Sequence, residues 1–412
     1  MAATPQDDLT EGAPPAVSPN RLSPIRFVAA FGIVSALGDF VYEGARSNIG
    51  PFLGSLGASA ATVGLITGLG EAVAYIFRLA SGPLIDRTGR PWPQTIIGYA
   101  LTMVCVPLLA VSGGLTTAAL LYNGERFGKA VRSPSRDTML AHAASSVGRG
   151  KAFGLHEALD QFGATLGPIA ISLVLVLGVS VKASFAVLAV PGAIALLVLA
   201  RLRRAVPDPT FYDPAAELSE QKRLTLDRHL PRTFWLYAAF SAATMLGFST
   251  WAVLSYHLAV RHVVSPGVVP LLYAVAMGAA AIAALGFGKV YDLFGLRGLV
   301  FLPPLAAVIP FLSFTTSVPL VVLGAVLWGA AMGIHESTMR AAVADLVPRH
   351  RRGAGYGVFT AIYGLSWFGG AALIGLLYEH GTHVVAGYVV GVQVVAMLLV
   401  LPLLKRVTVA TP

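Results

Sequence analysis

Long apolar runs that recur along the whole chain constrain its fold more than any other feature. Of its 412 residues, 56% are hydrophobic and only 12% are charged, against roughly 25% charged residues in a typical soluble domain. A membrane-spanning helix needs about 20 mostly apolar residues, and lipid requires that such a run satisfy its own backbone polar groups. We expect twelve spanning helices, at about residues 27–50, 59–84, 94–112, 116–142, 152–177, 181–201, 233–258, 267–288, 298–314, 318–343, 354–378 and 384–404. The sequence therefore predicts an all-α membrane protein.

The net charge of +9 is explained by where the basic residues lie, so it does not indicate a nucleic-acid partner. Basic residues crowd alternate loops: Arg87, Arg90, Arg149, Lys151, Arg201, Arg203, Arg204, Lys222, Arg223, Arg228, Arg232, Lys289, Arg297, Arg349, Arg351, Arg352, Lys405 and Arg406. The other loops hold few, with Lys182 and Arg261 as exceptions. The positive-inside rule places the basic loops and both termini in the cytoplasm, in a bacterial-type inner membrane.

One long polar segment divides the spans into two sets of six. We expect a disordered cytoplasmic tail at 1–25, helical bundles at 26–202 and 233–405, a cytoplasmic linker at 203–232 with a short surface helix, and a tail at 406–412. The first apolar run follows a Pro-rich acidic stretch, which is not the pattern of a cleavable signal peptide. A single cysteine, Cys105, leaves no internal disulfide to form.

A charged turn is repeated at an offset of 206 residues. Both copies read G-x3-D-x2-G with a basic residue following, and they comprise Gly82, Asp86, Gly89 and Arg90, then Gly288, Asp292, Gly295 and Arg297. A second repeat relates residues 149–154 to 352–357, at an offset of 203. Matched turns in the two halves of a membrane chain indicate an internally duplicated protein.

With these motifs the chain resembles the major facilitator superfamily of secondary transporters. The fifth span carries part of an antiporter-type signature: Gly154, Gly163, Gly167 and Pro168. Ile171 and Ser172 stand where the full signature has two glycines. The resemblance implies two pseudo-symmetric six-helix halves that alternate in access, as in bacterial drug and metabolite proton antiporters.

The resemblance also implies a gating role for the repeated turns. Asp86, flanked by Arg87 and Arg90, is expected to meet the start of the eleventh span near Gly353 in the outward-open state. Asp292 is expected to meet the start of the fifth span in the same way. A carboxylate at a helix N-terminus is stabilised by the helix dipole and the free N–H groups.

Ionisable residues inside the spans are the best guide to mechanism, because they are costly in lipid. Asp39, Glu43 and Arg46 share one stripe of the first span, and Glu71 lies near the middle of the second. These residues fit either a proton or substrate site facing a central cavity, or salt bridges between helices.

The fourth span carries a second stripe of charge: Glu125, Arg126, Lys129, Arg132 and Arg136. We expect Glu125 and Lys129 to form an i,i+4 pair. Glu157 and Asp160 open the fifth span and are expected to form a structural or gating network with Arg132 and Arg136. Arg126 and Lys129 lie deeper, where they would bind an anionic group or pair with the acids of the first span.

The second half is far less charged. His335, Glu336 and Arg340 lie in the tenth span, and the seventh and eleventh spans offer hydroxyl and aromatic groups. This asymmetry predicts that the first half couples transport to protons and that the second supplies hydrogen bonds and aromatic surfaces to a substrate.

Three functions remain open at this stage. Our leading hypothesis is a monomeric transporter that exports a small organic molecule in exchange for protons. The alternatives are uptake of an organic anion, with Arg46, Arg126 and Lys129 as ligands, and a non-transporting sensor on the same fold. An enzyme is not expected, since the sequence has no H-E-x-x-H or G-x-S-x-G pattern. We expect no cofactor and no metal.

Overall fold

The computed structural model describes residues 22–213, 230–348 and 351–407, and the fold is built from long helices. The first half contains α1 (Pro24–Ser55), α2 (Ala60–Ile76), α3 (Arg78–Thr88), α4 (Pro91–Leu108), α5 (Leu115–Val147), α6 (Arg149–Val176), α7 (Val181–Val187) and α8 (Ala189–Ala205). The second half contains α10 (Arg232–Leu246), α11 (Trp251–Val260), α12 (Val268–Phe294), α13 (Leu302–Ser313), α14 (Val318–Leu346), α15 (Arg352–Tyr378) and α16 (Thr382–Val407).

In the described part of the chain, these helices form twelve segments that run from one end of the molecule to the other, called crossings below. Ten stretches are long and apolar enough to span a membrane. One of them, Val268–Ser313, contains two helices, α12 and α13. The crossing α5 is too rich in charge to be counted among the ten. Pairs of consecutive short helices, such as α2 with α3, each form one crossing. The helix order is therefore consistent with the twelve predicted spans, whose ends differ from the helix ends by several residues.

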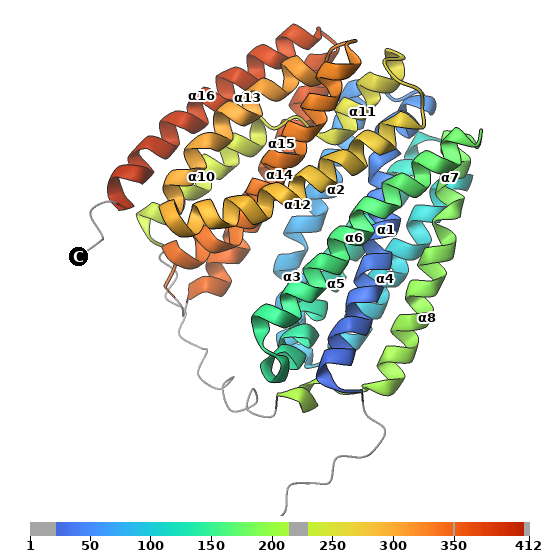
Figure 1. Cartoon of the computed structure of the whole chain (residues 1–412), viewed down its shortest axis with the longest axis vertical. Coiled ribbons are helices and arrows are strands. Elements are labelled where there is room, and N and C mark those ends of the chain that lie inside the picture. Colours follow the sequence, from blue (N-terminus) through green and yellow to red (C-terminus); the bar gives the residue numbers. More distant parts are fainter. Residues whose placement is uncertain (1–21, 214–229, 349–350, 408–412) are drawn as a thin grey trace, which may run out of the picture.

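Each half has its own hydrophobic core. The halves meet where α1 packs on α11, α2 on α15 and α6 on α12 (Figure 1). The predicted linker helix and most of both tails lie outside the described residues.

Small residues bring the two halves into backbone contact at one end of the molecule, the closed end. A Cβ atom on Gly50 would lie 2.1 Å from the carbonyl oxygen of Ala252, and one on Gly64 would lie 2.2 Å from that of Ala371. Gly375 is equally close to Ala60, at 2.3 Å. Helices with glycine at the contact approach closely enough for their backbones to touch.

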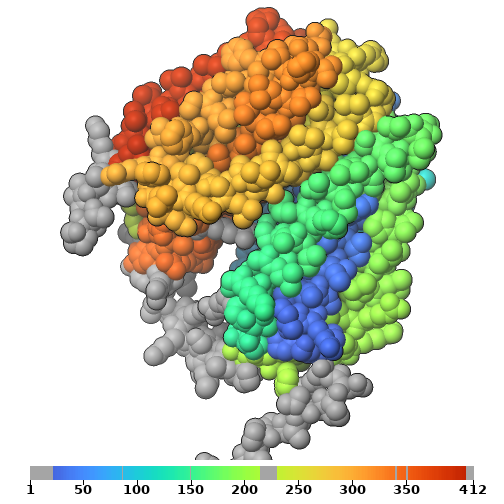
Figure 2. Space-filling model, in the orientation of Figure 1, coloured from blue at the N-terminus to red at the C-terminus, as the bar shows by residue number. Residues whose placement is uncertain are grey.

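At the other end, the open end, the halves diverge. Figure 2 shows a cleft between α6 and α12 that widens toward this end, where α1 begins and α8 finishes. A Cβ atom on any of four open-end glycines would have nothing within 4 Å: Gly82, Gly150, Gly288 and Gly353. The structure is therefore a conformation open on one side only.

The repeated turn forms matched helix ends. Gly89 ends α3 and Gly295 ends α12, each with a positive φ of 58°. This region of backbone conformation favours glycine because a Cβ atom is strained there. The predicted duplication of the turn is thus visible as two helix terminations at the open end.

Candidate functional site

A cavity of about 690 Å³ lies between the halves. Its two walls differ in chemistry. The wall from the first half includes Asp39, Tyr42, Glu43, Arg46, Lys129, Arg132, Arg136 and Asp160. The wall from the second half includes Tyr273, Met277, Trp328, Met332, Glu336 and Ser337. The predicted asymmetry of charge between the halves therefore appears as a charged wall facing an aromatic and thioether wall.

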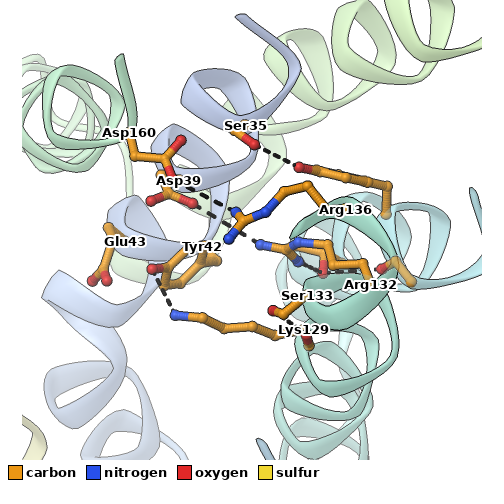
Figure 3. Close-up of polar contacts among 12 residues, drawn as sticks. Ser35, Asp39, Tyr42, Glu43, Lys129, Arg132, Ser133, Arg136 and Asp160 are labelled. Carbon is orange, nitrogen blue, oxygen red and sulfur yellow. Dashed lines mark hydrogen bonds and ion pairs between the residues drawn. The ribbon is translucent and has the colours of Figure 1, made fainter. Parts of the chain in front are cut away.

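Asp39 and Asp160 lie opposite two guanidinium groups. An Asp39 carboxylate oxygen is 4.0 Å from Nη2 of Arg132, and one of Asp160 is 3.6 Å from Nη1 of Arg136. Figure 3 shows the two carboxylates and the two guanidinium groups facing one another between α1, α5 and α6. Of the predicted network between the fourth and fifth spans, the Arg136–Asp160 pair is present. Arg132 pairs with Asp39 of α1, and Glu157 accepts a hydrogen bond from Gln161 of its own helix at 3.4 Å.

A hydrogen-bonded chain leads from Asp160 into the first half. His156 Nδ1 is 3.4 Å from Asp160, and its Nε2 is 2.9 Å from the Ser35 hydroxyl. Ser35 is in turn 2.8 Å from the Tyr99 hydroxyl. Ser35 is buried, so this Ser-His-Asp arrangement offers no nucleophile to the cavity. It fixes the register of α1 against α4 and α6.

Behind the cavity wall, three buried charged residues form a cluster that Arg46 of the wall joins. Arg126 Nε is 2.6 Å from Glu125, and its Nη1 is 3.3 Å from Glu71. Arg46 reaches the same Glu71 carboxylate at 3.1 Å. Glu71, Glu125 and Arg126 are not among the residues that line the cavity. These three candidates hold α2 and α5 together rather than facing a ligand.

Lys129 does not form the expected pair with Glu125. Its ammonium donates to the Tyr42 hydroxyl at 2.7 Å and lies 4.0 Å from the centre of the same ring. Glu125 turns instead toward Arg126, which also contacts Glu71 on the neighbouring helix. Lys129 thus projects into the cavity while Glu125 is withdrawn from it.

The candidates of the first span connect the halves. Glu43 accepts a hydrogen bond from Tyr273 of α12 and lies 3.6 Å from Arg46 of its own helix. The Arg46 guanidinium also stacks over Trp367 of α15, 5.4 Å from the ring centre. The Glu43–Tyr273 hydrogen bond and the Arg46–Trp367 contact each join α1 to the second half.

The antiporter-type glycines pack α6 against α1. A Cβ atom on Gly163 would lie 2.0 Å from the Ala36 carbonyl oxygen, and one on Gly167 would lie 2.1 Å from that of Phe40. Pro168 is inside α6. Gly154 has open space around it. Two of the glycines therefore allow close packing within the first half.

The gating candidates lie at the open end. Arg87, Arg90, Glu157 and Asp292 are exposed there, and Gly82 and Gly288 border open space. At the first turn of α3, Leu79 is close to Gly357 of α15. The side chain of Asp86 is outside the described part of the structure. A Cβ atom on Gly150 or Gly353, at the starts of α6 and α15, would have nothing within 4 Å.

Several cavity residues were not anticipated from the sequence. They are aromatic and sulfur-containing side chains: Tyr42, Tyr75, Tyr273, Met277, Trp328, Met332 and Tyr356. Each lies in an apolar run, where hydropathy alone does not separate a cavity-facing residue from a packed one. The seventh-span hydroxyls and aromatics that the sequence offered are not part of the cavity wall.

Two six-helix halves around a polar central cavity, closed at one end and open at the other, define a membrane transporter of the alternating-access type. The sequence matches the Major Facilitator Superfamily over residues 32–297 and 236–412. The chain belongs to this superfamily.

Its relatives and structural neighbours agree with this assignment. An uncharacterized protein of Mycobacterium tuberculosis is 46% identical over 92% of this chain and 93% of its own length. An uncharacterized MFS-type transporter of Methanocaldococcus jannaschii is 23% identical over 85% of this chain and 88% of its own. The crystal structure of the nucleoside transporter NupG superposes with a TM-score of 0.71 at 14% identity, covering 90% of this chain and 98% of NupG.

Proposed function

We propose that this protein is a proton-coupled antiporter that exports a small organic molecule. One observation carries the proposal: Asp39 faces the cavity and is held by Arg132 only across 4.0 Å, with Asp160 and Arg136 beside it. Carboxylates in a cavity between membrane helices are groups that bind and release protons. A long ion pair is easily exchanged for a proton or a ligand.

The orientation follows from the basic helix ends. Arg87, Arg90, Arg204 and Arg232 lie at the open end, whereas Lys182 and Arg261 lie at the closed end. With the positive-inside rule, the open end faces the cytoplasm. The conformation described is then inward-open and ready to receive a cytoplasmic substrate.

The mechanism uses competition at the cavity wall. A substrate enters from the cytoplasm while Asp39 is deprotonated, and the halves rock to expose the cavity to the outside. Protonation of Asp39 removes the charge that holds Arg132, releases the substrate and favours the return. Each elementary charge that crosses the membrane contributes about 2.3 kcal/mol per 100 mV, so an inward proton gradient is sufficient to drive export.

The test is transport by purified protein in liposomes that contain a pH-sensitive dye. A thermal-shift screen of metabolites and drugs first selects a stabilising probe, which is then supplied under an imposed pH gradient. We expect Asp39→Asn to abolish proton movement coupled to the probe, and Glu43→Gln to impair it strongly. Asp208→Asn, a carboxylate change in an exposed turn outside the cavity, is the control. Full coupled transport by both Asp39→Asn and Glu43→Gln would contradict the proposal.

Uptake of an organic anion is less well supported by the site. Of its three expected ligands, Arg46 and Arg126 are engaged with Glu71 at 3.1 and 3.3 Å, and Arg126 is not exposed to the cavity. Only Lys129 keeps its charge toward the cavity without a carboxylate partner among the described residues. Counterflow with outwardly and inwardly directed gradients separates export from uptake.

A further inference from the structure

Two cavity side chains of opposite charge, one from each half, have no ion partner among the described residues. Lys129 of α5 contacts the Tyr42 hydroxyl and ring, and no carboxylate lies within ion-pair distance of it. Glu336 of α14 is exposed to the cavity and takes part in neither a hydrogen bond nor an ion pair of the described structure. Asp39, Arg132, Arg136 and Asp160 are by contrast in ion pairs. Glu157, which also lines the cavity, accepts a hydrogen bond from Gln161 at 3.4 Å.

The unpaired charges lie in the middle part of the membrane at comparable depth. Both helices start at the closed end, and Lys129 is 14 residues along α5 whereas Glu336 is 18 residues along α14. At 1.5 Å per residue these positions are about 21 Å and about 27 Å from the helix starts. The difference is within the reach of a lysine side chain and a small ligand. Both residues line the same cavity.

A charge left unpaired at this depth is costly, so it is a site for a ligand that carries the opposite charge. A ligand with one charge would pair with either Lys129 or Glu336 and would leave the other residue unpaired. A ligand with both charges satisfies both walls at once, and it also draws α5 and α14 together.

On the second half, the cavity lining includes a packed layer of aromatic and thioether side chains, in which the Tyr273 and Trp328 rings are 0% and 1% exposed. The Tyr273 ring is held by its hydrogen bond to Glu43, and Trp328 donates to the carbonyl of Ser249 at 2.6 Å. The two ring centres are 6.0 Å apart. Met277 and Met332 complete this layer, and thioethers adapt to ligands of different shape.

We propose that the cavity recognises a small zwitterion with an aromatic or other apolar body, its ammonium bound by Glu336 and its carboxylate by Lys129. The body would pack on Met277 and Met332, the two members of this layer that keep some exposed area in the cavity lining. This inference rests on the transport function proposed above and names the substrate class for the same cavity. It leaves Asp39 free to bind the proton.

Three probes of matched shape test the charge requirement by equilibrium binding to the purified protein. Phenylalanine carries both charges, phenethylamine only the ammonium, and 3-phenylpropanoate only the carboxylate. We expect phenylalanine to bind at least about tenfold more tightly than either analogue, since each missing group removes a charge-assisted hydrogen bond. Leucine, methionine and tryptophan extend the test to other apolar bodies.

Replacing Lys129 or Glu336 by Gln should change which of the three probes the protein prefers, and not only weaken binding of all three. Lys129→Gln is expected to lose the preference for phenylalanine over phenethylamine and to retain the preference over 3-phenylpropanoate. Glu336→Gln is expected to do the reverse. Lys129→Arg and Glu336→Asp should restore much of each preference. Lys182→Gln, a lysine of α7 at the closed end, is the control and should bind all three probes as the unmodified protein does.

The proposal is overturned if no zwitterion of the set binds, if phenylalanine binds no better than its singly charged analogues, or if both Gln variants lose all probes equally. These measurements use no gradient, so they are separate from the test of coupling. Gradient-driven transport by Asp39→Asn would reject the proton site while leaving the charge preference intact. Loss of the preference with coupling preserved would reject only the substrate class.

Discussion

Tyr273 of α12 donates a hydrogen bond to the Glu43 carboxylate of α1 and so ties the two halves together at the cavity. Glu43 also has an ion-pair partner on its own helix, Arg46, at 3.6 Å. The bond between the halves can therefore be deleted without leaving the carboxylate isolated.

We predict that Tyr273→Phe shifts the protein away from the conformation described here. A hydrogen bond to a charged group contributes about 1.5–3 kcal/mol, which is roughly a tenfold to hundredfold change in an equilibrium. Spin labels at Lys182 of α7 and Thr382 of α16, on opposite halves at the closed end, report the change as a longer distance. Cys105 is replaced first.

Tyr291→Phe is the matched control, because Tyr291 donates to Asp345 at 2.9 Å within the second half alone. It should leave the distance between the labels unchanged. An equal shift in both variants would show that the Tyr273 hydroxyl has no special role between the halves.

Neutralising Arg126 should destabilise the first half. Arg126 is 1% exposed and compensates both Glu71 and Glu125. Breaking a buried pair by removing one partner costs about 3–5 kcal/mol, because the other charge stays buried without compensation. We expect Arg126→Gln to lower the unfolding temperature of the purified protein, and the triple variant with Glu71→Gln and Glu125→Gln to recover part of the loss. A triple variant less stable than the single one would contradict this account.

The signature glycines of α6 should differ in their tolerance of a methyl group. Gly163→Ala places a Cβ atom against the backbone of α1, whereas Gly154→Ala enters open space. Overpacking costs about 1–3 kcal/mol, and backbone cannot move aside as a side chain can. We expect lower thermal stability and transport for Gly163→Ala, with Gly154→Ala close to the unmodified protein. If Gly154→Ala were the more harmful change, the motif would act at the open end and not through packing.

Glu379 should make the closed end sensitive to acid. Glu379, just after α15, accepts hydrogen bonds from the Ser59 side chain and from the Ala61 N–H at the start of α2. These bonds lower the pKa of this carboxyl below its ordinary 4.5. Because the pKa is lowered in the closed arrangement, the contact stabilises closure above pH 4.5 and loses this effect as the pH falls through the lowered value.

The spin-label pair at the closed end measures this effect as a function of pH. We expect the population with separated labels to rise below about pH 4.5, in the direction that linkage requires. Glu379→Gln should remove this part of the pH dependence and leave the rest. A pH profile identical in the variant and the unmodified protein would exclude Glu379 as the responsible group.

Hydropathy was sufficient to predict the fold, because lipid permits few alternatives to a helix of the right length. Even α5 was recognised, since its charges fall on one stripe and leave the remaining faces apolar. The repeated turn predicted the duplication, and both copies end a helix with a glycine of positive φ. These features depend on local sequence alone.

The site was only partly predictable for a physical reason. Helical spacing shows which residues share a face, but not which neighbouring helix that face meets. Glu125 and Lys129 were therefore expected to pair, whereas Arg126 pairs with Glu125 and with Glu71 of α2. Tyr273 and Trp328 lie in apolar runs, and only their position opposite α1 and α5 distinguishes them from packed residues.

The glycine contacts at the closed end have a mechanical consequence. At Gly64 and Gly375 the nearest atoms across the joint are all backbone, so no side chain interlocks at these two positions. The halves can then rotate about this contact without a change of side-chain rotamer at these positions. The distance between the two backbones limits this motion. One methyl group added at Gly64 would force α2 and α15 apart at the closed end.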